Sequence, residues 1–449
     1  MTDRVTHNVQ SKRLKKRYQA EKRFKFFGLA AIFSAAAILL VLLGGLTFMS
    51  IPAFTHHYVT LDISIPETTL SNDQISDAEA IRKVNWRGKV RKSLRNEFPD
   101  VTDRSGKRAI GGLLSVGAGD VLRDRVINNP SIIGSTLSVA LPLSDDIDLL
   151  LKGLIDRSQP EDNRVISDRE LSFIDHLEAS GRIERRIAWF LFTSGDSREA
   201  EMAGLRSAFV GTLLTMLVTL LFSFPLGVMA AIYLEEIAPK NRFTDIIEVN
   251  INNLAAVPSI VFGLLGLAVF INFFHLPRSA PLVGGMVLAL MTLPTIIIAT
   301  RAALAAVPPS IKEAALGVGA SPMQVIFHHV LPLAMPGILT GTIIGLAQAA
   351  GETAPLLMIG MMAFIVDTPL WIDDKATVLP AQIYMWANNP ERAFQAKTAA
   401  GIICLMVFLL FMNALAIYLR KKYEKSRNFR HGQKICRNRS AKFAWQNGR

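Results

Sequence analysis

Six long apolar segments constrain the fold of this chain more than any other feature. They lie at about residues 26–50, 206–234, 252–274, 282–302, 333–363 and 397–419. Each is long enough to cross a hydrocarbon layer of roughly 30 Å, which takes about 20 helical residues. Because the layer holds no water to bond a free backbone, such segments fold as helices. We therefore predict an all-α polytopic membrane protein with six transmembrane helices.

The first apolar segment has the properties of a retained membrane anchor. The run from Phe26 to Met49 exceeds the core of a signal peptide, and no clear small-residue cleavage site follows it. The composition agrees with a membrane protein, since 50% of the residues are hydrophobic and the mean hydropathy is +0.32. We expect one N-terminal anchor at 26–50, followed later in the chain by a core of five helices.

Both ends of the chain are strongly basic, which predicts their location. Residues 1–25 contain nine Lys and Arg against Asp3 and Glu21, and residues 420–449 contain eleven against Glu424. Basic flanks stay in the cytoplasm, and six spans put both ends on the same side. We expect two basic cytoplasmic tails, and attraction to anionic lipid headgroups explains their charge. Nucleic-acid binding is not needed to explain them, and no such partner is predicted.

The polar segment 51–203 follows the anchor and is predicted to fold outside the cytoplasm. Tyr58–Ile65 and Ile133–Leu143 alternate in the way strands do, and Ser144–Lys152 has the pattern of a helix. Arg185–Thr193 is a further apolar run. These patterns predict a small α+β insert of modest core size.

No chemistry is evident in this insert. We interpret Asp145, Asp146 and Asp148 as the start of a helix, where carboxylates favour the dipole, rather than as a cation site. Metal-ligand spacings, nucleophile motifs and phosphate-binding loops are missing from its sequence. Cys404 lies in the sixth span and Cys436 in the tail, so neither can form a disulfide within the insert.

Residues 204–419 form the five-span core, and its connections are short. Prolines interrupt its helices at Pro225, Pro258, Pro294, Pro332, Pro336 and Pro355. Membrane helices tolerate such breaks when neighbouring segments satisfy the freed carbonyl groups.

A polar hairpin is predicted between the fourth and fifth spans. After Pro308-Pro309, Ser310 and Glu313 have the spacing of a capping box, and Gly317 and Gly319 are expected to end the first helix. Ser321 and Gln324 form a second box, which opens a helix running to His328–His329. Two helices this short are unstable alone. The hairpin is therefore either docked in the groove of a partner or an ordinary loop with good capping residues.

The fifth span combines small residues with a carboxylate. Gly337, Gly341, Gly345 and Ala349 recur every four residues, a stripe that lets another helix backbone approach closely. Gln348 and Glu352 are expected to share roughly the face of Gly341 and Gly345.

A carboxylate facing lipid costs at least ~2.5 kcal/mol, so Glu352 should face a cavity or a partner helix. Its role is either in a translocation path or structural, paired with a basic or hydroxyl group. Ser259 and Asn253 near the third span similarly either line a path or bond neighbouring helices.

The hairpin resembles the EAA loop of bacterial ABC-transporter permeases. Six residues fall in register with that motif: Glu313, Ala314, Ala315, Gly319, Leu331 and Pro332. His329 stands where the family has isoleucine. In this family the loop docks on an ATP-hydrolysing subunit, so the resemblance implies ATPase coupling through these residues. The chain has no G-x-x-x-x-G-K-[ST] motif, and we expect ATP to be bound by partner subunits and no cofactor on this chain.

Two further motifs resemble those of phosphate-specific permeases. Residues 351–357 read GETAPLL and residues 257–263 read VPSIVFG, similar to the family's G-E-T-A-P-L-L and V-P-S-I-V-x-G. The resemblance over 204–419 implies a MetI-like permease core of the PstA type, a subunit of an ATP-driven phosphate importer and not an enzyme. It also implies three kinds of partner: a homologous PstC-like permease, two PstB-like ATPase subunits and a periplasmic PstS-like phosphate-binding protein.

Five residues are candidates for the translocation path or gate: Glu352, Thr353, Gln348, Ser259 and Asn253. Relatives commonly have an arginine one turn before G-E-T, whereas the nearest polar residue here is Gln348. Because like charges repel, Glu352 would have to pair with a basic group, gate the path, or favour a protonated substrate. Alternative functions are a permease for sulfate, molybdate or another small solute, a membrane sensor, and a membrane-anchored ectoenzyme.

Overall fold

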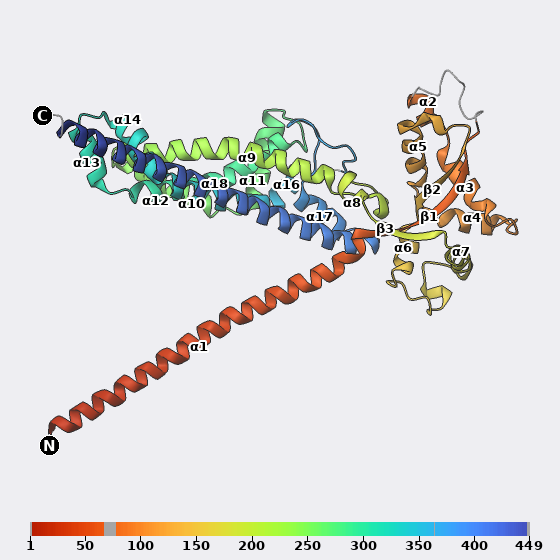
Figure 1. Cartoon of the computed structure of the whole chain (residues 1–449), viewed down its shortest axis with the longest axis horizontal. Coiled ribbons are helices and arrows are strands. Elements are labelled where there is room, and N and C mark those ends of the chain that lie inside the picture. Colours follow the sequence, from red (N-terminus) through yellow and green to blue (C-terminus); the bar gives the residue numbers. More distant parts are fainter. Residues whose placement is uncertain (1, 67–77, 363, 447–449) are drawn as a thin grey trace.

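The chain folds into a bundle of long helices and a smaller unit built on a sheet (Figure 1). The computed structural model describes residues 2–66, 78–362 and 364–446. The smaller unit is formed by the chain between helix α1 (Thr2–Ser50) and helix α9 (Arg206–Ile232). The predicted fold class, a helical membrane protein with an α+β insert, is confirmed.

The sheet of the insert is antiparallel, and strand β1 (Thr55–Ser64) lies in its middle. Strand β2 (Thr136–Pro142) pairs on one side, where Leu61 opposes Val139 and both side chains are fully buried. The predicted strands at 58–65 and 133–143 are therefore confirmed.

A third strand, β3 (Ile183–Ile187), pairs with the other edge of β1. The sequence interpretation missed it, because its three central residues are charged and no alternation of apolar residues marks it. The segment that follows forms a short helix, α8 (Phe190–Thr193), so the predicted apolar run at 185–193 is divided between two elements.

Short helices surround the sheet and enclose the core of the insert. They are α2 (Ala78–Lys83), α3 (Trp86–Asn96), α4 (Arg104–Gly112), α5 (Ala118–Asn128), α6 (Asp145–Leu151) and α7 (Asp168–Ala179). Leu94 of α3, Leu122 of α5 and Ile174 of α7 belong to one buried cluster with the inner residues of β1 and β2. The insert thus has a hydrophobic core of its own.

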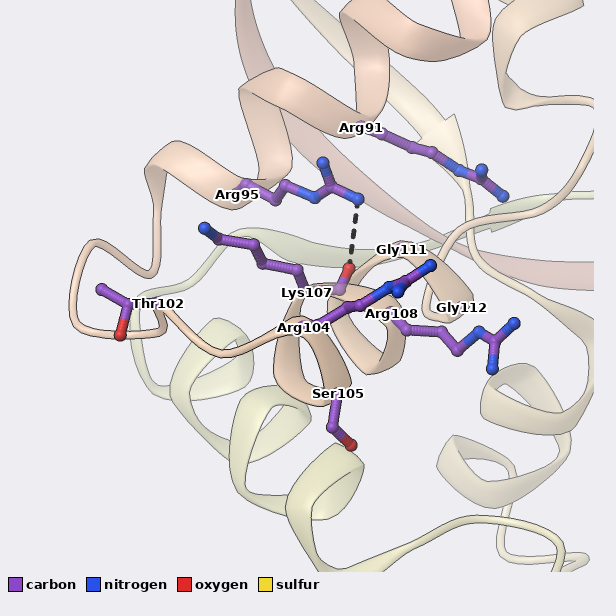
Figure 2. A pocket seen from close by; sticks show the side chains of 9 residues that line it. All are labelled: Arg91, Arg95, Thr102, Arg104, Ser105, Lys107, Arg108, Gly111 and Gly112. Atoms are coloured by element: carbon purple, nitrogen blue, oxygen red, sulfur yellow. Dashed lines mark hydrogen bonds between the residues drawn. The ribbon is translucent and has the colours of Figure 1, made fainter.

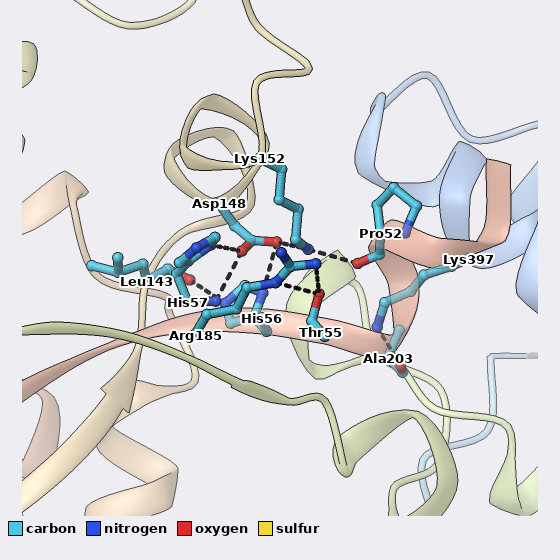
Figure 3. A network of polar contacts seen from close by, with 10 residues as sticks. All are labelled: Pro52, Thr55, His56, His57, Leu143, Asp148, Lys152, Arg185, Ala203 and Lys397. Atoms are coloured by element: carbon cyan, nitrogen blue, oxygen red, sulfur yellow. Dashed lines mark hydrogen bonds and ion pairs between the residues drawn. The ribbon is translucent and has the colours of Figure 1, made fainter. Parts of the chain in front are cut away.

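Helix α6 confirms the helix predicted at 144–152, and Ser144 is its N-cap residue. Asp145 and Asp146 lie half-buried in the first turn, as the dipole interpretation predicts. Asp148 differs, because it is buried and belongs to a network of polar contacts at the joint between the insert and the helical bundle (Figure 3).

The carboxylate of Asp148 is surrounded by cationic and N–H groups. Its Oδ1 accepts from the backbone N–H of His57 at 2.9 Å and lies 2.8 Å from Nδ1 of the same residue, while its Oδ2 lies 3.0 Å from Nδ1 of His56. Lys152 forms an ion pair with it. Burial alone would raise the pKa of Asp148, but the bonds from His56 and His57 and the Lys152 charge hold that pKa well below its usual value.

The network fastens the insert to the first and last long helices. Nζ of Lys152 also donates to the carbonyl of Pro52, 2.7 Å away, at the end of α1. Lys397, buried in helix α18 (Ala393–Gln446), donates to the carbonyl of Ala203 just before α9 (Figure 3). Because these bonds are shielded from water, the insert is held at the joint rather than loosely tethered.

The Asp148→Asn substitution is expected to destabilise the insert by about 3 kcal/mol at neutral pH, because it leaves the buried ammonium group of Lys152 unpaired. A carboxyl whose pKa is lowered on folding contributes stability above its unfolded pKa and loses it in acid. The loss of stability caused by the substitution should therefore be smaller below about pH 4 than at neutral pH. The measurement is thermal unfolding of the full chain in detergent, followed by near-UV circular dichroism at several pH values.

Asp146→Asn is the matched control, since Asp146 lies in the same helix and forms no ion pair with any described residue. It should shift the unfolding temperature little. Equal effects of the two substitutions at neutral pH would contradict the role given to Asp148.

Five helices are long and apolar enough to cross a membrane in the described part of the chain. They are Lys16–Phe54, Arg206–Ile237, Pro281–Ala305, Pro322–Ala350 and Ala393–Lys422. A bent pair of helices makes a sixth crossing if it counts as one span, which matches the predicted number. The apolar window of the first helix is 0% buried, and Figure 1 shows α1 diverging from the bundle.

The bent pair corrects the predicted third span at 252–274. Helix α10 (Arg242–Ala255) and helix α11 (Ser259–Gly266), which a π-helical segment extends to Phe273, meet at an angle of 101°. The break lies at Ala256–Pro258. Proline lacks the N–H of a helical turn and disfavours helical geometry in the residue before it, so the helix ends there although the apolar character continues.

The predicted fifth span at 333–363 is also interrupted. Helix α15 (Leu331–Ala350) ends at Gly351, and a short helix α16 (Ala354–Met358) follows. Glu352 therefore lies beyond the end of α15, and the prediction that it shares a helix face with Gly341 and Gly345 is wrong. Gly351 is the C-cap residue of α15, and Pro355 lies in the first turn of α16, where its missing N–H is not needed.

The small-residue stripe of α15 packs against helix α12 (Pro281–Ala305), as the sequence predicts for a close helix pair. A Cβ atom at Gly337 would lie 2.7 Å from Cβ of Ala303, and one at Gly341 would lie 2.1 Å from Cβ of Ala299. Both distances are too short for real side chains, so the two glycines are what allows the helices to approach.

Candidate functional site

The hairpin begins with helix α13 (Pro309–Gly317). Pro308 is its N-cap residue and makes no side-chain cap bond, so the predicted capping box of Ser310 and Glu313 is wrong. Ser310 lies inside the first turn instead. Pro309 explains the earlier start, since proline is favoured at the first helical position, where its missing N–H is not needed.

Gly319 ends this helix as predicted. Its φ of +89° is in the left-handed region, which favours glycine. Its N–H donates to the carbonyl of Leu316 at 2.9 Å, and the N–H of Ala320 donates to the carbonyl of Ala315 at 3.1 Å. This pair of bonds is a Schellman motif, which satisfies carbonyl groups at the helix end. Gly317 is the last helical residue.

The predicted capping box of Ser321 and Gln324 is present. The N–H of Ser321 donates to Oε1 of Gln324 at 2.9 Å, and the N–H of Gln324 donates to Oγ of Ser321. The helix that it opens does not stop at His329, however. It continues through α14 (Pro322–Gln324) and a π-helical segment (Val325–Val330) into α15, a single helix of 29 residues.

Leu331 and Pro332 therefore lie within a helix rather than in a linker, which corrects the prediction of a separate second helix. The π-helical turn ends directly before them. A widened turn of this kind accommodates a proline whose N–H is missing from the regular bonding pattern. A displacement of the hairpin is consequently passed directly into the fifth span.

The hairpin has one buried face and one exposed face. Ala315, Val325 and Ile326 are buried in a cluster with Ile232 at the end of α9 and Leu304 of α12. The exposed apolar residues, which we call the hairpin ridge, are Leu316, Val318, Met323 and Phe327, with exposed fractions of 49%, 85%, 52% and 49%. Glu313 and Ala314 are exposed beside them. Apolar groups gathered at a surface are typical of a protein-binding site.

Ion pairs fix the base of the hairpin to neighbouring helices. Arg301 of α12 pairs with Glu235, 3.1 Å away after the end of α9, and with Glu248 of α10, 2.6 Å away. Lys312 of α13 pairs with Glu236, 2.7 Å away. These five residues clamp four segments together. Sequence reasoning missed them, although charged residues directly beside apolar spans were the available signal.

The two motifs that resemble phosphate permeases meet in space. A Cβ atom at Gly263 of α11 would lie 2.7 Å from Cα and O of Pro355 in α16. One at Gly266 would lie 3.3 Å from Cγ2 of Ile359. Both helices therefore run in the same direction along their contact, which places Ser259, one turn before Gly263, toward the end nearest Glu352.

The predicted path residues occupy three segments around this contact. Ser259 is half-buried in the first turn of α11, whereas Asn253 is exposed on α10 across the 101° bend. Gln348 is exposed in the last turn of α15. Glu352 and Thr353 are half-buried between α15 and α16.

The side chain of Glu352 has no hydrogen bond or ion pair with any residue that the structure describes. The sequence left open a structural role in which Glu352 pairs with a basic or hydroxyl group. Such a pair is not seen among the described residues. No group of three or more His, Cys, Asp and Glu residues in the described ranges could hold a metal ion. The arrangement offers an uncompensated carboxylate and hydroxyl groups beside two closely packed helices.

Two family models match the chain. Residues 223–425 match the binding-protein-dependent transport system inner membrane component. Residues 11–161 match a domain of unknown function, DUF3333.

Similar proteins include permeases from several bacteria. The phosphate transport system permease protein PstA 2 of Mycobacterium bovis is 34% identical over 209 residues, which cover 46% of this chain and 69% of the relative. The phosphate transport system permease protein PstA of Yersinia pestis is 32% identical, with 49% and 74% covered. Among solved structures, the MetNI methionine ABC transporter in an inward-facing conformation matches with a TM-score of 0.40 and 17% identity, covering 49% of this chain and 95% of that one.

Proposed function

The chain belongs to the PstA-type permeases of phosphate transport systems, and from this premise we propose how its parts work in an ATP-driven importer. It is a transmembrane permease subunit that carries inorganic phosphate and is a multi-pass protein of the inner membrane. It forms half of the translocation path and takes its energy from a separate ATPase. The chain does not change its cargo chemically.

The exposed hairpin ridge supports the proposal that the ATPase binds this segment and pushes on it. Its four apolar side chains are exposed, while the opposite face is packed against α9 and α12. The ion pairs of Arg301 and Lys312 join its base to three other segments. A push on the ridge would therefore move several spans as a unit, which is the kind of rigid-body shift that switches transporters between states.

The six residues of the coupling motif have different roles. They are Glu313, Ala314, Ala315, Gly319, Leu331 and Pro332. Glu313 and Ala314 are exposed and would contact the ATPase, whereas Ala315 anchors the inner face. Gly319 shapes the turn, and Leu331 and Pro332 connect it to α15.

Permeases of this family work with an ATPase and a substrate-binding protein. For this chain we infer a PstC-like second permease, two PstB-like ATPase subunits that bind the ATP, and a periplasmic PstS-like phosphate-binding protein. The hairpin and both chain ends are cytoplasmic in this proposal, and the insert is periplasmic. Support comes from Figure 1, where α13, α14 and both ends of the chain lie away from the insert.

Five residues are proposed to line or gate the translocation path. They are Glu352, Thr353, Gln348, Ser259 and Asn253. Glu352 supports this role most directly, since an intramembrane carboxylate without a partner among the described residues has to meet one elsewhere. A basic group of the second permease, or a proton, would let it coexist with an anionic cargo.

The Glu352→Gln substitution is expected to lower phosphate uptake by at least about tenfold, a change equal to about 1.4 kcal/mol, while assembly stays intact. The test is uptake of labelled phosphate by vesicles that contain the complete importer. Asp367→Asn, an exposed carboxylate farther along the chain, is the control and should transport normally. Normal uptake by the Glu352 variant would refute the path role, and faster uptake of labelled sulfate than of phosphate would refute the cargo.

A further inference from the structure

The insert has a strongly basic hollow on its surface, formed by helices α3 and α4 (Figure 2). Its volume is about 950 Å³. The cationic residues that line it are Arg91, Arg95, Arg104, Lys107 and Arg108. Thr102, Ser105, Gly111 and Gly112 complete the lining. None of the lining residues is acidic.

The two helices place these cations together because of their residue spacing. Arg91 and Arg95 are four residues apart on α3, as are Arg104 and Arg108 on α4, so each pair lies on one helix face. Other faces of the two helices hold core residues such as Val90 and Ile110. Nη2 of Arg95 donates to the carbonyl of Lys107 at 3.3 Å, which links the two helices at the hollow.

The carboxylates near the hollow form hydrogen bonds or ion pairs with residues outside its lining. Asp103 is bound by two nitrogen atoms of Arg169, at 2.8 and 2.5 Å, and by the N–H of Gly106. Glu170, beside Gly112, accepts from the N–H and hydroxyl of Ser167 in a capping box. The five lining cations form no ion pair with any residue that the structure describes.

Arg91 lies among other positive charges. Burial lowers the pKa of Arg91, and the neighbouring charges of Arg87 and Arg95 lower it further. Like charges that crowd a concave surface focus a positive potential there and attract anions. A bound anion would relieve this repulsion.

The position of the hollow favours a soluble ligand. Figure 1 shows α3 and α4 on the side of the insert away from the helical bundle. Lipid headgroups surround the bundle, so a ligand that reaches this side comes from the surrounding medium. Guanidinium groups bind the oxygen atoms of tetrahedral oxyanions in pairs, whereas a monovalent halide offers no such geometry.

We propose that the hollow between α3 and α4 is a binding site for a soluble phosphate-type oxyanion, of which inorganic phosphate is the smallest member. The site is separate from the translocation path and needs neither ATP nor partner subunits. It gives the insert a ligand-binding role of its own.

The test is equilibrium dialysis of labelled inorganic phosphate against the full chain alone, in nanodiscs of neutral lipid. The double variant Arg91→Gln/Arg108→Gln is expected to raise the Kd by about tenfold or more, since each charge-assisted bond contributes substantially to affinity. Arg82→Gln/Lys92→Gln removes the same charge from exposed residues outside the hollow and should leave the Kd nearly unchanged. Arg91→Lys/Arg108→Lys keeps the charge but loses the paired geometry, so an intermediate Kd is expected.

Three results would overturn the proposal. They are equal affinities in the two glutamine variants, no saturable phosphate binding by the unaltered chain, and capture of the chain by phosphatidylglycerol vesicles without binding of soluble phosphate. Because partner subunits and ATP are absent, the result does not depend on whether the chain transports phosphate.

Discussion

The Gly263→Leu substitution is expected to abolish phosphate uptake. A Cβ atom at this position would lie 2.7 Å from backbone atoms of Pro355, which cannot rotate away as a flexible side chain could. The added side chain would force α11 and α16 apart and so separate the two motifs that meet there. Uptake by vesicles with the complete importer measures the effect, and Gly263→Ala should already cost about 1–3 kcal/mol of stability by overpacking.

Gly345→Ala is the matched control for this prediction. Gly345 also lies in a membrane helix, but a Cβ atom there would be 3.7 Å from its nearest neighbour, an ordinary contact. We expect this variant to transport phosphate normally and to unfold at the usual temperature. Near-normal uptake by Gly263→Leu would show that the contact between α11 and α16 is not needed for transport.

Phe327→Asp and Val318→Asp are each expected to release the ATPase subunits from the permease. Both residues belong to the hairpin ridge, and a carboxylate placed in an apolar interface loses its hydration without gaining a partner. Truncating a central interface residue typically costs about 2 kcal/mol or more, so affinity should fall at least about thirtyfold. Titration of purified ATPase subunits against the permease pair in nanodiscs measures the change.

Ser310→Asp provides the control for the hairpin, because Ser310 is exposed at the start of α13, outside the ridge. It adds the same charge and should leave ATPase binding intact. If the ridge variants bind the ATPase as tightly as this control does, the exposed apolar residues are not the docking surface.

Hydropathy predicted five of the six spans in the correct order, because the cost of an unsatisfied backbone in lipid applies to every segment alike. It could not predict where a span bends. Apolar residues continue across Ala256–Pro258, and only the geometry of proline turns the chain by 101° there. The end of α15 at Gly351 escaped prediction for the same reason.

Local motifs of the hairpin were predictable to the extent that they depend on nearby residues. The left-handed Gly319 and the Ser321–Gln324 box both involve partners within a few positions. The box at Ser310 failed because Pro309 moved the start of the helix. The contact of Gly263 with Pro355 joins segments far apart in the chain, and no spacing rule encodes such a meeting.

The buried joint around Asp148 and Lys397 has a mechanical consequence. Since the insert is bonded to α18 and to the end of α1, a tilt of these helices rotates the whole domain with them. Its far side is displaced more than the joint, as the tip of a lever moves farther than its pivot. The distance between one fluorescent dye on this far side and a second dye on a partner subunit would therefore report the tilt of the last helix.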